Sequence, residues 1–152
     1  MATALAQSRG FLLLLVALTA MGPFAMQIFL PALPAIQRAF EVDIATAQLV
    51  FSLSGVAMAL GTLAYGPLAD RHGRRPVLVA AVALFIVGSV AAFFAPTIEL
   101  LIVGRIVQAA GGVAGLVLSR TIVRDLFDRS RAAEMIAWLT VGMVAVPMVS
   151  PT

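Results

Sequence analysis

Long apolar runs separated by short charged segments dominate the sequence. A membrane-spanning helix needs about 20 mostly apolar residues. Three charge-free runs satisfy that length, at 10–37, 44–69 and 76–98. Each run is long enough to cross a bilayer, so this pattern predicts membrane-spanning helices.

The fourth apolar run is shorter and changes the placement of one charge. After Arg105 the charge-free stretch 106–119 has 14 residues, which reach about 21 Å as a helix. The third helix has just crossed the membrane, and the arginines at 120–131 form the next charged loop. The fourth helix must therefore begin near Ile98, and Arg105 lies inside the membrane.

A fifth apolar run follows Glu134, with Pro147 and Pro151 expected to kink it. We predict an all-α polytopic membrane bundle of about five transmembrane helices, near 10–30, 46–66, 77–95, 98–119 and 133–151. Pro31 and Pro34 are expected to end the first helix, and 95–97 to form a tight turn. A cleavable signal peptide over 9–22 is the weaker alternative, because no small-x-small cleavage site follows it.

Composition excludes most soluble classes. Apolar residues make up 62% of the 152 residues and charged residues 11%, whereas a soluble domain carries about a quarter charged residues. There is no lysine and no cysteine, and one histidine, so lysine Schiff bases, thiolate metal sites and cysteine nucleophiles are excluded. We therefore expect no catalytic residue, no metal, no cofactor and no enzyme activity.

The arginines predict the orientation. Eight lie in the N-terminal tail and in the second and fourth loops, whereas the opposite side has Arg38 beside Glu41 and Asp43. By the positive-inside rule the N-terminus is cytoplasmic and Thr152 faces outward. Because the arginines lie in short loops between apolar runs, the net positive charge predicts contact with a lipid bilayer and no binding of nucleic acid.

The loop after the second helix, 66–76, has an ordered set of charged and glycine residues. The simplest interpretation is a cytoplasmic loop that follows the positive-inside rule, which explains the presence of the arginines but not their order. Gly73 permits a turn at positive φ, and Asp70 at a helix end can face an arginine. The string GPLADRHGRR resembles the loop signature of the major facilitator superfamily. That resemblance implies a cytoplasmic gate motif comprising Gly66, Asp70, Arg71, Gly73, Arg74 and Arg75.

The fourth helix carries the second motif, in which Arg105 and Gln108 share a face and glycines follow at 111, 112 and 115. We expect Gly111, Gly112 and Gly115 to permit close helix packing. A membrane arginine costs at least about 2.5–3.5 kcal/mol, which favours a functional role; the alternative is snorkelling to the outer interface. The string RxxQAxGG resembles the RxxQGxG signature of proton-coupled drug antiporters, with Ala109 in place of a glycine.

The end of the first helix, QIFLPALP at 27–34, together with 123–127 resembles the bicyclomycin/chloramphenicol resistance subfamily. Members have an acid where this chain has Gln27, and a glutamine cannot take up a proton. The resemblance implies a proton as coupling ion, with Arg105, Gln108 and Gln27 as substrate or coupling residues. We expect the Gln27 Oε1 to accept a hydrogen bond from Arg105.

The resemblance covers essentially the whole chain. The chain, however, accounts for only the first five of the twelve helices usual in the superfamily. It implies a fragment: the N-terminal part of a proton-coupled multidrug efflux transporter, exporting small amphipathic drugs by alternating access across the bacterial inner membrane. The missing C-terminal helices would be its partners. The alternative is a truncated, non-transporting membrane protein that acts only through helix–helix assembly.

Overall fold

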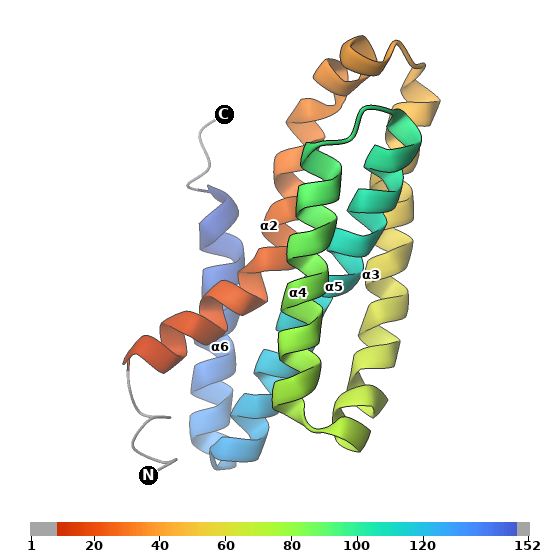
Figure 1. Cartoon of the computed structure of the whole chain (residues 1–152). Helices are drawn as coiled ribbons and strands as arrows, with labels where there is room; N and C mark the ends of the chain where they lie inside the picture. The colour runs from red at the N-terminus through yellow and green to blue at the C-terminus, as the bar shows by residue number, and fades with distance from the viewer. Residues whose placement is uncertain (1–8, 149–152) are drawn as a thin grey trace.

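Five helices and the turns between them make up the part of the chain that the computed structural model describes, residues 9–148 (Figure 1). Within these residues there is no strand, which confirms the all-α prediction. The helices are α2 (Arg9–Phe40), α3 (Ile44–His72), α4 (Arg74–Phe93), α5 (Ile98–Leu126) and α6 (Arg129–Met148).

Four of the helices, α2 to α5, are long and apolar enough to cross a membrane. Helix α6 is not among the candidate spans found within the described residues. The end of the predicted fifth span, 149–151, lies outside the described residues. Together with the apolar composition, these spans make the chain a multi-pass membrane protein.

The prediction that Pro31 and Pro34 end the first helix is wrong. Helix α2 continues to Phe40 and contains both prolines, as well as Pro23. Breaking a helix within a bilayer would leave several more backbone groups without partners, so continuing past a proline is the better outcome there. The N-terminal part of α2 runs at a steep angle to the rest (Figure 1). Pro23, which lacks the N–H that would bond the carbonyl of Thr19, accounts for a bend in this half of the helix.

The helix boundaries at the turns follow from local capping. The Asp43 side chain accepts a hydrogen bond from the Thr46 N–H and starts α3. Thr97 caps α5 in the same way, so α5 begins at Ile98 as predicted. Gly73 has φ +90°, which confirms the predicted turn at positive φ between α3 and α4.

Several helices are longer than predicted at the end that carries the charged turns. Helix α3 ends six residues beyond the predicted position 66, and α5 seven residues beyond 119. The length of an apolar run corresponds to the part of the helix inside the hydrocarbon layer, which is about 30 Å thick. A 29-residue helix reaches about 44 Å, so its last turns extend past that layer.

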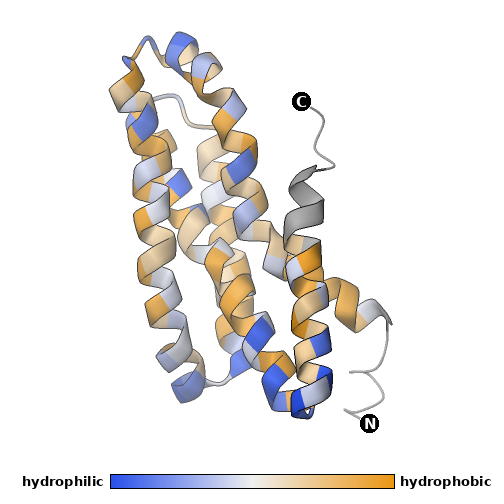
Figure 2. Ribbon diagram, turned by 180° about the vertical axis from the view of Figure 1, so that it is seen from behind, coloured by the Kyte–Doolittle hydropathy of each residue, from blue (hydrophilic) through white to orange (hydrophobic). Residues whose placement is uncertain are grey.

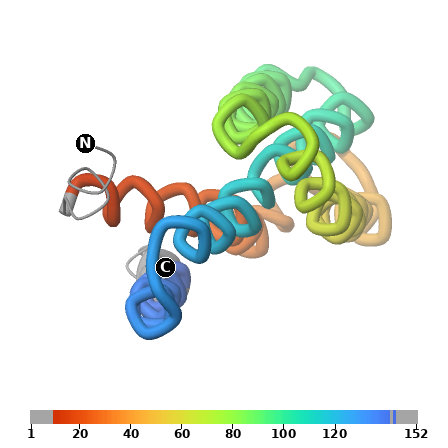
Figure 3. Tube along the Cα trace, turned by 90° about the horizontal axis from the view of Figure 1, so that it is seen from below, coloured from red at the N-terminus to blue at the C-terminus, as the bar shows by residue number. Residues whose placement is uncertain are grey.

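Helix α5 is the centre of the bundle. Half of its most apolar window is buried inside the protein, against 17–22% for the other three spans. It packs against α4, α3 and α2, and it lies between the α3–α4 pair and the α2 and α6 helices (Figure 3). Polar side chains in the buried middle of α5, such as Arg105 and Ser119, are therefore held between neighbouring helices.

Candidate functional site

The buried charge predicted in the fourth helix lies on α5, seven residues from its start. Arg105 is 8% exposed although it carries a full positive charge. Within the described residues both ion pairs are formed by Arg74. Arg105 is thus a buried cation without a carboxylate partner in this part of the chain.

A chain of hydrogen bonds connects Arg105 to α4. Its Nη1 donates to the Oε1 of Gln108 at 2.5 Å. The Gln108 Nε2 donates to the Ser89 hydroxyl at 2.8 Å, and that hydroxyl donates to the Phe85 carbonyl at 2.7 Å. The Gln108 amide and the Ser89 hydroxyl, both partly buried, thus each have partners in this relay.

Arg105 also reaches across to α2. Its Nη2 donates to the backbone carbonyl of Ala25 at 3.0 Å, and its guanidinium carbon lies 4.5 Å from the centre of the Phe29 ring. A cation over an aromatic face is attracted by the ring electrons. The Nε of Arg105 is buried and has no hydrogen-bond partner. One side chain therefore ties α2, α4 and α5 together inside the membrane.

The expected hydrogen bond between Gln27 and Arg105 is wrong. Gln27 is exposed, and the α2 groups that meet Arg105 belong to Ala25 and Phe29. Those two residues are four apart and share a helix face. Gln27 lies two positions from each, about 200° away at 3.6 residues per turn, and so points to the opposite side.

Glycines allow the close helix contacts around this site. A Cβ at Gly88 of α4 would lie 2.3 Å from the Gln108 nitrogen, and one at Gly111 would lie 2.4 Å from the Phe85 nitrogen. A Cβ added at Gly112 would lie 3.0 Å from the Cα of Gly22 in α2. One added at Gly115 would lie 2.0 Å from the Leu18 carbonyl oxygen. The three predicted packing glycines thus face neighbours within this chain.

A second polar cluster lies at the α3–α4 turn. Arg74 forms ion pairs with Asp70 at 2.5 Å and with Asp125 of α5 at 3.1 Å. All three side chains are partly exposed. Arg74 therefore links the turn to the end of α5, within one bundle.

Other members of the predicted gate motif have different surroundings. Arg71 and Arg75 are exposed, and neither is in an ion pair within the described part of the chain. A Cβ at Gly66 would meet nothing within 4 Å, so close packing inside this chain does not require that glycine. The turn itself requires Gly73.

Sequence reasoning missed two partners, Ser89 and Asp125. Ser89 lies in an apolar run and carries no motif. Asp125 was noted only as part of the resemblance over 123–127, although an acid at a helix end beside arginines is a signal for an ion pair.

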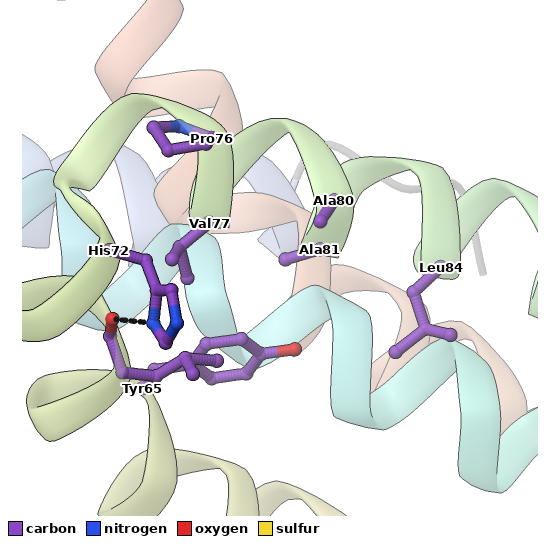
Figure 4. A pocket seen from close by; sticks show the side chains of 8 residues that line it. Tyr65, His72, Pro76, Val77, Ala80, Ala81 and Leu84 are labelled. Atoms are coloured by element: carbon purple, nitrogen blue, oxygen red, sulfur yellow. Dashed lines mark hydrogen bonds between the residues drawn. The ribbon is translucent and has the colours of Figure 1, made fainter.

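An apolar groove of about 430 Å³ lies between α3 and α4 near the same turn. Figure 4 shows its lining, with the His72 ring beside that of Tyr65. The His72 Nδ1 lies 3.2 Å from the Leu68 carbonyl oxygen. Within the described residues no group of three or more acidic, histidine or cysteine side chains is placed to hold a metal ion.

Comparison with known proteins agrees with the motifs. The profile of the Major Facilitator Superfamily matches residues 13–152. The chain is 31% identical over 140 residues to multidrug resistance protein D of Escherichia coli strain K12, covering 92% of this chain and 36% of that protein. It is 33% identical over 141 residues to multidrug resistance protein MdtL of E. coli O139:H28, covering 93% and 36%.

A further relative is the uncharacterized MFS-type transporter YdgK of Bacillus subtilis strain 168, 34% identical over 134 residues, covering 88% and 33%. The chain thus spans about a third of the length of the relatives it matches. No solved structure matches it.

Proposed function

The chain belongs to the Major Facilitator Superfamily, and we propose that it forms the N-terminal part of a proton-coupled multidrug efflux transporter in a bacterial inner membrane. Two of its relatives are named multidrug resistance proteins. The observation that carries the proposal is the buried Arg105, which contacts three helices and has no acidic partner among the described residues. An uncompensated charge within a membrane is costly, which favours a functional role for it.

In this proposal the Arg105–Gln108 pair contributes to the substrate or coupling site. The buried cation would attract a polar group of the substrate or a carboxylate from the rest of the transporter. The acids of the described residues lie at or beyond helix ends. We therefore assign the group that takes up the proton to another part of the transporter, and Gln27, on the other face of α2, to substrate contact.

The α3–α4 turn would serve as the cytoplasmic gate. Arg74 fixes the turn to α5 through Asp70 and Asp125. The exposed Arg71 and Arg75 would then contact the second helix bundle and release it when the bundles move apart. The excess of arginine at this end supports placing the N-terminus and the turn in the cytoplasm.

The test is drug accumulation in cells that lack their own efflux pumps and express the transporter containing this chain. Arg105→Lys keeps the charge but cannot reproduce the two guanidinium bonds. We expect it to raise accumulation of an amphipathic antibiotic toward the level of cells without the transporter. The matched control is Arg38→Lys, since Arg38 is exposed and its one side-chain hydrogen bond within the described part of the chain goes to the Pro34 carbonyl. Equal export by both variants would contradict the assignment of Arg105.

The alternative function, assembly with other helices alone, predicts no export by any variant. The observed glycine contacts give this alternative little support. Gly111, Gly112 and Gly115 already pack against helices of this chain and are not free to contact another protein. Export by the 152-residue chain alone would also contradict our proposal. The proposed substrate site lies between two helix bundles, and this chain supplies part of only one of them.

A further inference from the structure

A second groove, of about 440 Å³, lies where α5 and α6 meet. It is lined by Arg124, Phe127, Arg129, Ala132, Ala133 and Ile136. Arginines and apolar side chains therefore share one depression, which is not part of the Arg105 site or of the Arg74 cluster. Its volume lies within the usual range for small-ligand sites.

The positive charge of this groove is not neutralised locally. Arg124 and Arg129 are both exposed, and neither is in an ion pair within the described part of the chain. The neighbouring Asp125 is bound to Arg74 on the side of α4. Residues 120–131 contain four arginines and two aspartates, which leaves a net charge of +2.

The groove lies at a boundary between polar and apolar surface. Figure 2 shows hydrophilic residues gathered at the end of the bundle that holds the α5–α6 turn, with apolar helix surface beyond it. Helix α5 is one of the candidate spans and ends at Leu126. The groove therefore lies where a bilayer changes from head groups to acyl chains.

We propose that this groove binds an anionic phospholipid of the adjacent leaflet. The lipid phosphate would contact Arg124 and Arg129, and an acyl chain would cover Phe127 and Ile136. Basic pockets between membrane helices bind anionic head groups in this way. A soluble anion would leave the apolar wall exposed to water, and the ammonium group of a zwitterionic lipid would offset the attraction. This inference depends on membrane insertion and not on transport.

The test is a titration of the full chain, purified in an uncharged detergent, with acyl-labelled fluorescent phosphatidylglycerol or phosphatidylcholine, followed by anisotropy. We expect phosphatidylglycerol to bind more tightly. Arg124→Gln and Arg129→Gln should each raise its Kd about fivefold, because one arginine near a lipid surface contributes about 1 kcal/mol. Arg131→Gln removes the same charge two residues from Arg129 but outside the groove, and should change the Kd less than twofold.

A charge-neutral variant tests the apolar wall. Ala133→Phe fills the groove and should weaken phosphatidylglycerol binding without changing the net charge, with circular dichroism as the check on folding. The proposal is overturned if Arg131→Gln weakens binding as much as Arg124→Gln, since diffuse charge would then suffice. It is equally overturned if phosphatidylcholine binds as tightly as phosphatidylglycerol. Displacement of the probe by millimolar glycerol 3-phosphate would instead reveal a soluble-anion site.

Discussion

The contact between α4 and α5 at Gly88 offers a direct test of the site's construction. Replacing Gly88 with alanine places a Cβ 2.3 Å from the Gln108 nitrogen, 2.7 Å from its Cα and 2.8 Å from the Gly104 carbonyl oxygen. All three atoms belong to backbone, so no flexible side chain can move aside. The two helices must separate at this point.

The size of the effect follows from that distance. Ordinary contact of a Cβ begins at 3.4 Å, so the helices must move apart by about 1 Å. Overpacking of this kind costs about 1–3 kcal/mol. Ser89 follows Gly88 directly and accepts the hydrogen bond of Gln108 at 2.8 Å. Stretching that bond adds about 0.5–1.5 kcal/mol.

The assay is unfolding of the purified chain in mixed micelles with increasing dodecyl sulfate, followed by circular dichroism. The control is Gly55→Ala on α3, where the nearest atom to the new Cβ is the flexible Met26 Cε at 3.7 Å. We expect Gly55→Ala to be neutral or to stabilise by up to about 1 kcal/mol through helix propensity. If Gly88→Ala were as stable as this control, the close approach of α4 to α5 would be refuted.

Three further outcomes follow from the structure. Ser89→Ala should destabilise the chain by about 1 kcal/mol in the same unfolding assay, because the partly buried Gln108 amide loses its acceptor. Asp125→Asn should lower stability slightly at low salt and have no effect near 1 M NaCl, because its exposed ion pair with Arg74 is screened. Hydrogen bonds at the start of α3 lower the pKa of Asp43. Its carboxylate therefore stabilises the fold above the usual pKa and ceases to do so as the pH falls through the lowered value. Helix content by circular dichroism between pH 6 and 2 should thus fall more in the wild type than in Asp43→Ala.

The number and order of helices could be predicted from the sequence because apolar run length and arginine position are one-dimensional signals. The start of α5 at Ile98 followed from requiring Arg105 to be inside the membrane. The end of the first helix could not be predicted from Pro31 and Pro34, because their local preference yields to the need for bonded backbone in lipid. The extension of α5 past Ser119 also escaped prediction, since charged turns of a helix resemble a loop in sequence.

The site was predictable only within one helix. Arg105 and Gln108 are three residues apart, so their contact follows from helical spacing. The partners on other helices depend on how each helix is rotated, and the sequence does not state that rotation. Ala25 and Phe29 face Arg105 while Gln27, two residues from each, does not. The same lack of rotational information concealed Ser89.

The central proposal is that this chain belongs to a transporter that exchanges drug for protons through the Arg105 site. Its most direct test is reconstitution of the transporter containing the chain into vesicles with an imposed pH gradient, with drug flux and internal pH recorded together. We predict that drug movement follows the gradient and stops when a protonophore collapses it. Arg105→Lys should abolish both fluxes while Arg38→Lys preserves them. Drug movement that ignores the gradient, or that survives in Arg105→Lys, would contradict the account.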